Sequence, residues 1–249
     1  MANWQDPRAT SAGFGGVRTG VDSAAFDAGL RSYMLSIYNY MASAVLVTGV
    51  VAMLFAPYAA DILVNESGRG LSILGWVIML APLGFVMVLN FGINRLATST
   101  AQMIFWAYAV VMGLSMSTIF LAYTDTSIAQ AFFASAAAFA GLSLYGYTTK
   151  RDLAPLGTFL IMGVVGILVA GLLNIWLQSS GLHLAISILG VLIFAGLTAY
   201  DTQQLKSSYA YVAGTDMMGK TVILGALNLY LDFINMFMFL LRLFGSSRN

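Results

Sequence analysis

The stretch from residue 226 to residue 241 is apolar over nearly its whole length, yet it carries one carboxylate, Asp232, near its middle. With its flanks it is long enough to cross a bilayer as a helix, which takes about 20 residues. A charged side chain at the bilayer centre costs roughly 2.5–3.5 kcal/mol on insertion scales. Asp232 must therefore face protein or water, and the stretch predicts a helix at the core of a bundle.

Two amides accompany this carboxylate. Asn228, Asp232 and Asn235 are spaced four and then three residues apart, so they share one face of a helix. We predict that Asn228 and Asn235 are polar residues of the protein core or of a pore. Hydrogen bonding between helices is the alternative role for both amides.

The composition fixes the class of protein. The chain is 59% hydrophobic and 8% charged, against about 25% charged residues in an ordinary soluble domain, which indicates an all-α integral membrane protein. The net charge of +1 gives no sign of nucleic-acid binding. The absence of cysteine and the single histidine, His183, exclude thiolate and multi-histidine metal sites. We expect no cofactor and no enzymatic activity.

The apolar segments predict seven transmembrane helices, of which the C-terminal one is central. We place them at residues 33–58, 71–93, 101–123, 128–147, 155–177, 184–205 and 221–244. Residues 1–29 are polar and contain Pro7, and we expect them to form a flexible tail. Residues 30–249 then form one transmembrane domain. No strand pattern occurs.

The basic residues predict the orientation in the membrane, because cytoplasmic loops are enriched in Lys and Arg. A cytoplasmic N-terminus places eight of the eleven basic residues inside and three outside. The inner group is Arg8, Arg18, Arg31, Arg95, Lys150, Arg151, Lys206 and Lys220, and the outer group is Arg69, Arg242 and Arg248. With seven spans, the C-terminus lies outside.

A second acid lies inside an apolar span. Asp201 shares a helical face with Thr198 and Thr202, near the inner end of the sixth span. At 1.5 Å per residue, its depth differs from that of Asp232 by about 5–10 Å. Adjacent antiparallel helices would bring the two acids into contact, where both cannot comfortably be ionised. We predict that Asp201 and Asp232 share a proton and act as a pH sensor and gate; hydrogen-bonded packing is the alternative.

Three further residues complete the predicted site. Thr198 and Thr202 add hydroxyl groups beside the acids, and Arg95, at the inner end of the second span, is either their counter-ion or an interfacial anchor. Calcium prefers six to eight oxygen ligands. The acids, amides and hydroxyls make an incomplete shell, which favours weak and transient calcium binding at Asp201 and Asp232.

Two motifs occur near the end of the chain. The first is Ala199-Tyr200-Asp201-Thr202-Gln203-Gln204-Leu205-Lys206. The second is Leu227-Asn228-Leu229-Tyr230-Leu231-Asp232-Phe233-Ile234-Asn235, followed by Leu240-Leu241-Arg242. Both resemble motifs of the Bax inhibitor family, the transmembrane proteins that carry the Bax inhibitor motif. Weaker similarity at residues 147–153 and 159–163 extends the resemblance over about residues 30–244.

The resemblance implies six helices around a central seventh and a pH-sensitive calcium leak with its paired-aspartate sensor at Asp201 and Asp232. It also implies a link between Arg95 and the closed state. One departure concerns the second span, where some bacterial relatives carry an acid and this chain reads Pro82-Leu83-Gly84-Phe85. An ion path along that helix is therefore in doubt.

The leading functional hypothesis is a calcium leak channel in a bacterial inner membrane; an endoplasmic-reticulum location stays open. One alternative is a non-conducting regulator that binds a membrane protease or a cell-death or stress factor. An aspartyl protease is a weaker one, because Leu229-Tyr230-Leu231-Asp232 replaces the Gly-x-Gly-Asp motif. A proton-coupled transporter is weaker still. The expected partners are the lipid bilayer, calcium ions and other membrane proteins.

Overall fold

The computed structural model of the chain describes residues 15–65 and 70–248. In this part of the chain the secondary structure is helical, and extended residues pair only as isolated bridges. The helices are α1 (Gly15–Leu63), α2 (Ile73–Gly92), α3 (Thr98–Met116), α4 (Ile119–Ala122), α5 (Asp125–Thr148), α6 (Ala154–Leu177), α7 (Ser180–Val212) and α8 (Met217–Phe244).

Seven segments of the described chain are long and apolar enough to span a membrane, once α3 and α4 are taken together. This confirms the prediction of an all-α protein with seven spans. Large apolar side chains, such as Phe91 on α2 and Phe159 and Trp176 on α6, are exposed on the outside of the bundle. Soluble monomers rarely expose apolar surface on this scale. These faces are therefore suited to contact with lipid.

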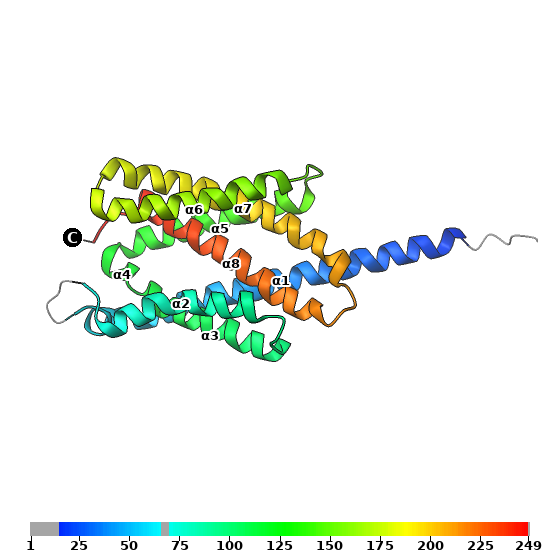
Figure 1. Ribbon diagram of the computed structural model, residues 1–249, viewed down its shortest axis with the longest axis horizontal. Helices are drawn as coiled ribbons and strands as arrows, with labels where there is room; N and C mark the ends of the chain where they lie inside the picture. The colour runs from blue at the N-terminus through cyan, green and yellow to red at the C-terminus, as the bar shows by residue number, and fades with distance from the viewer. Residues whose placement is uncertain (1–14, 66–69, 249) are drawn as a thin grey trace, which may run out of the picture.

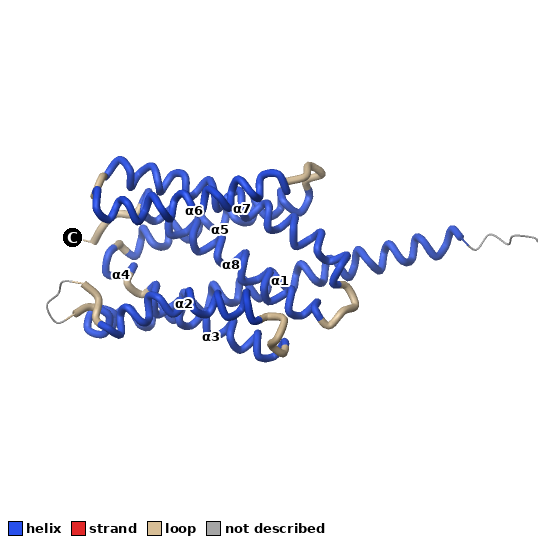
Figure 2. The backbone as a smooth tube through the Cα atoms, in the orientation of Figure 1, coloured by secondary structure: helices blue, strands red, loops and turns tan. Residues whose placement is uncertain are grey.

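The helices form two groups with α8 between them (Figure 1). In one group α1, α2 and α3 pack together, and in the other α5 and α6 pack on α7. Figure 2 shows α8 running obliquely through the middle. We call the end of the bundle that holds the α2–α3, α5–α6 and α7–α8 connections the inner end, following the predicted orientation.

Helix α8 is the most buried of the spanning helices: 67% of its most apolar stretch is buried, against 44% or less for the others. It contacts α1, α2, α3, α5 and α7, and its contact with α7 is the most extensive between any two helices. Helix α6 packs mainly on α7 instead. The polar face predicted for the last span is thus held inside protein.

Two local features differ from the expectation. Helix α1 begins at Gly15, so residues 15–29 are helical rather than a flexible tail, and residues 1–14 lie outside the described part of the chain. Proline interrupts the interior of a helix, and no proline occurs between Gly15 and Pro57. The helix of the first span can therefore extend toward the N-terminus.

The third predicted span is divided at Ser117 and Thr118, between α3 and α4. The Ser117 hydroxyl donates a hydrogen bond to the carbonyl of Leu114, and the Thr118 hydroxyl donates one to the carbonyl of Ser115. Such bonds from side chain to backbone compete with regular helix bonding, and they interrupt the helix here.

Candidate functional site: two aspartates between the last two helices

Asp232 lies in the middle of α8, and only 4% of the residue is exposed. Its Oδ2 atom is buried and has no hydrogen-bond partner among the residues that the structure describes. A buried polar atom that lacks a partner costs about 1–3 kcal/mol, and more if it is charged. The structure therefore retains Asp232 at a cost in stability, which is a reason to assign it a role other than packing.

Asp201 projects from α7, the helix that packs most closely on α8. Its side chain is half-buried, and its carboxylate is near enough to that of Asp232 to act on it electrostatically. Among the described residues, neither carboxylate forms an ion pair or a side-chain hydrogen bond. The structure thus brings the two predicted acids together on neighbouring helices without another charge to neutralise them.

Two glycines allow α7 and α8 to approach on either side of the acids. A Cβ atom added at Gly190 on α7 would lie 2.6 Å from the ring of Phe239, and one at Gly225 on α8 would lie 2.7 Å from Leu205. Close helix packing through small residues is common in membranes. Because these contacts lie on either side of the acids, the pair lies within a closely packed interface.

The two threonines of the predicted site are fully buried beside Asp201 in the sequence of α7. The Thr198 hydroxyl donates to the carbonyl of Phe194, 2.8 Å away on the same helix. Thr202 Oγ1 lies 3.0 Å from Ser143 Oγ, which lies 2.6 Å from the hydroxyl of Tyr38. Thr202 therefore belongs to a hydrogen-bonded chain that joins α1, α5 and α7.

The two asparagines of α8 are half-buried and flank Asp232. The Asn235 amide donates to the carbonyl of Leu231 on its own helix, at 2.8 Å. Asn228 makes no side-chain hydrogen bond to the described residues. Neither amide joins α8 to another helix here, so their roles as pore or core residues stay predictions.

Arg95 lies apart from the acids. It is exposed in the turn between α2 and α3 at the inner end, where its backbone N–H donates to the carbonyl of Gly92. Among the described residues the one ion pair is between Arg248 and Asp125 at the other end of the bundle. Arg95 is thus not paired with Asp201 or Asp232 in this structure, and its action as a counter-ion stays a prediction.

A second polar cluster, which the sequence did not indicate, lies where α8 meets α1 and α3. The Tyr230 hydroxyl is 2.7 Å from Thr48 Oγ1, which donates to the carbonyl of Ala109. The ring of Tyr108 packs edge-on against Tyr230 with centroids 5.2 Å apart. Its buried hydroxyl finds no hydrogen-bond partner in the described part of the chain. The sequence places both tyrosines inside apolar spans but does not indicate that they contact each other.

The donor set limits what the acid pair can hold. In the described part of the chain, no three His, Cys, Asp or Glu residues come together as a metal site. The two carboxylates offer four oxygens, fewer than the six to eight that calcium prefers. The two carboxylates alone therefore do not complete a calcium shell.

The sequence is similar to those of known proteins. The family profile described as "Inhibitor of apoptosis-promoting Bax1" matches residues 30–249. The chain is 46% identical over 226 residues to the protein RP147 of Rickettsia prowazekii, a match that covers 90% of this chain and 93% of that protein. It is 44% identical over 223 residues to inner membrane protein YbhL of Escherichia coli K12, covering 89% and 94% of the two chains.

Proposed function

The chain belongs to the Bax inhibitor family, as its motifs predicted, and from that premise we propose that it is a passive, pH-sensitive leak for cations, with calcium as the permeant ion. The gate is the pair Asp201 and Asp232. The observation that carries the proposal is the buried Asp232 carboxylate, which has an unpartnered oxygen and the second carboxylate beside it.

The direction of the pH response follows from the charge of the pair. At acidic pH the acids share a proton or are both neutral, and they can remain close together. As the pH rises, the second proton leaves, and two negative charges in a medium of low dielectric constant repel each other. The charged pair also attracts a cation, which the neutral pair does not. We therefore expect calcium flux to increase from acidic to neutral pH.

An incomplete ligand shell supports conduction. An ion must bind well enough to enter a pathway and weakly enough to leave it. The Asp201 and Asp232 carboxylates, with Asn228 and Asn235 on the same helix as Asp232, are the candidate ligands along that pathway. Neither acid lines the larger cavities described below, so we assign the structure to a closed state.

The proposed location is a bacterial inner membrane, which the printed name of the relative YbhL supports. The distribution of Lys and Arg supports a cytoplasmic N-terminus and an outer C-terminus. In that orientation Asp201 lies in the cytoplasmic half of α7 (Ser180–Val212), and protons and calcium reach the pair from that side. Arg95 lies on the same side, where it is placed to act as a counter-ion in another state.

The test is calcium flux into liposomes that contain the purified full-length protein, measured at a series of pH values from acidic to slightly alkaline, because an interacting carboxylate pair titrates in two steps. Wild-type flux should rise with pH, and Asp201→Asn and Asp232→Asn should abolish the pH dependence. Asp216→Asn, at an exposed acid in the α7–α8 connection, is the matched control and should behave as wild type. Flux that is unaffected by both substitutions would overturn the proposal and favour the non-conducting regulator.

A further inference from the structure

Two cavities lie between α1 and α5, which belong to different helix groups. We call the two cavities together the seam. Its outer half is a cavity of about 800 Å³ between residues 45–57 of α1 and residues 125–133 of α5. Its inner half is a cavity of about 570 Å³ between residues 31–38 of α1 and residues 139–147 of α5. Cavities of this size match those of small-molecule sites.

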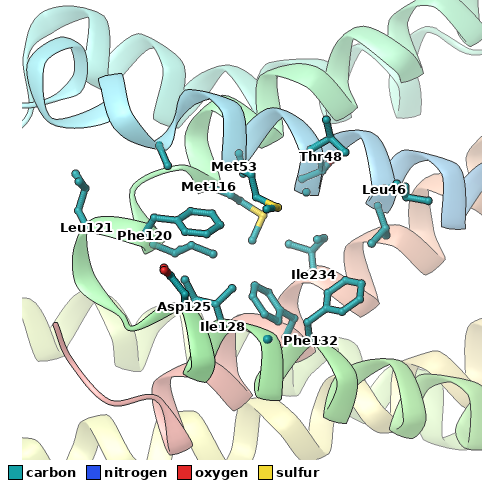
Figure 3. A pocket seen from close by; sticks show the side chains of 18 of the residues that line it. Leu46, Thr48, Met53, Met116, Phe120, Leu121, Asp125, Ile128, Phe132 and Ile234 are labelled. Atoms are coloured by element: carbon teal, nitrogen blue, oxygen red, sulfur yellow. The ribbon is translucent and has the colours of Figure 1, made fainter.

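The walls of the seam are apolar. In the outer half, Met53 and Phe120 from one side and Ile128 and Phe132 from the other lie around a common space (Figure 3). In the inner half, Met34, Leu35, Phe139 and Leu144 form the wall. All these residues belong to membrane-spanning segments. An occupant that enters from the bilayer must therefore be largely hydrocarbon.

The inner rim adds positive charge to this apolar wall. Arg31 lines the inner cavity, its side chain is exposed, and it forms no ion pair among the described residues. Lys206 Nζ donates to the carbonyl of Tyr147, another residue of the rim, and lies 4.9 Å from the centre of that ring. Because a lysine ammonium has three donors, Lys206 keeps two for a further acceptor.

We propose that the inner half of the seam binds one anionic phospholipid. Its phosphate lies at Arg31 and Lys206, and one acyl chain fills the apolar space between α1 and α5. The charge and the wall together select this occupant: an alkyl chain without a phosphate leaves the two cations unused, and a free phosphate leaves the cavity unfilled. The proposal does not depend on calcium conduction.

The position of the lipid gives it influence over the two helix groups. Tyr38 and Ser143 also line the inner cavity, and their 2.6 Å hydrogen bond is a direct link between α1 and α5. In the outer half of the seam, Phe233, Ile234 and Phe237 of α8 form part of the wall. A chain in the seam therefore fixes the separation of the groups on either side of the helix that carries Asp232.

The test uses the full-length protein in a mild detergent and native mass spectrometry. The probes are dioleoyl phosphatidylglycerol, dioleoylglycerol, which lacks the phosphate, and glycerol 3-phosphate, which lacks the acyl chains. We expect the first to bind most tightly. Arg31→Gln should weaken it about fivefold, since one basic residue contributes about 1 kcal/mol to anionic-lipid binding. Arg151→Gln, at an exposed inner residue outside the seam, should leave binding unchanged.

A second variant tests the apolar half of the site. Ala140 is exposed in the wall of the inner cavity, and Ala140→Trp should fill the space and weaken phosphatidylglycerol binding at least as strongly. Ala134→Trp, at an exposed alanine of α5 outside both cavities, is its control. If Ala140→Trp does not fold, Ala140→Met gives the same comparison with a smaller change. Binding that withstands both Arg31→Gln and the filled cavity, or equal binding of glycerol 3-phosphate, overturns the proposal.

Discussion

The α7–α8 interface and the seam between α1 and α5 both border the central helix, but they differ in packing and in charge. At the interface, glycines admit neighbouring side chains, and the rings of Phe194 and Phe239 stack with centroids 5.9 Å apart. The seam instead contains two cavities and one hydrogen bond between Tyr38 and Ser143. The unpartnered carboxyl oxygen thus lies where packing is tight, and the free volume lies where the walls are apolar.

This difference suggests how a change in charge becomes a movement. Under the proposed gate, repulsion between Asp201 and Asp232 would shift α7 and α8 as units, because packed interfaces do not deform smoothly. The seam would accommodate such a shift, because its cavities leave free volume between α1 and α5. The following predictions test each part of the contrast, from the largest expected effect to the smallest.

Gly190→Leu tests how tight the α7–α8 interface is. The added side chain meets the ring of Phe239, and overpacking of this kind destabilises by up to about 3 kcal/mol. Gly166→Leu is the control, since a Cβ atom at Gly166 on α6 has no neighbour within 4 Å. Unfolding in detergent, followed by circular dichroism, measures both. Equal free energies of unfolding for the two variants would show that the α7–α8 interface accommodates a larger side chain at residue 190.

Asp232→Leu separates a functional acid from a packing residue. The substitution removes a buried oxygen that has no partner, so we expect the free energy of unfolding to rise by about 2 kcal/mol while pH-dependent flux is lost. Asn235→Leu, one turn further along α8, removes an amide bonded to its own helix and should change stability little. A loss of stability in Asp232→Leu would support the packing alternative.

Ser143→Ala tests the polar link beside the seam. The variant breaks both the bond to Tyr38 and the bond to Thr202, and we expect a destabilisation of about 1 kcal/mol. It should also increase amide hydrogen exchange where α1 faces α5. Ser207→Ala removes an exposed hydroxyl bonded within α7 and serves as the control. Identical exchange in the two variants would contradict a linking role for Ser143.

Asp125→Asn should have the smallest effect. Its ion pair with Arg248 spans 3.7 Å, and the side chains are 71% and 54% exposed. Exposed pairs contribute little because water and salt screen them, so we expect less than about 1 kcal/mol. Thermal unfolding at low and high salt measures the contribution. A large loss of stability at low salt that disappears at high salt would contradict this expectation and would mean that charge holds the outer end of the seam.

The spans and the acid pair were predictable because each depends on a strong local signal. Hydrophobic length places seven helices, and the depths of Asp201 and Asp232 follow from counting residues along two adjacent spans. The division of the third span at Ser117 was missed because a hydroxyl that bonds within its own helix leaves no mark in hydropathy. The length of α1 was missed because polarity alone suggested a tail.

The seam and both hydrogen-bonded clusters were beyond the reach of the sequence. Most spans are apolar on all sides, so periodicity does not show which face meets which neighbour. Tyr38 and Ser143 are 105 residues apart, and Thr48 and Tyr230 are 182 apart, so their contacts arise only from the packed arrangement. The cavities likewise depend on how side chains from several helices pack together, so the sequence alone does not reveal them.

The most direct test of the central claim is an infrared titration of the carboxyl groups in the full-length protein in nanodiscs. The account predicts a protonated carboxyl band at acidic pH that is lost as the pH rises toward neutral and that changes in both Asp201→Asn and Asp232→Asn, because the proton belongs to the pair. Asp216→Asn should leave this band unchanged. If both acids stay ionised down to about pH 4, close to the ordinary titration range of an exposed aspartate, the pair does not share a proton and the proposed gate is wrong.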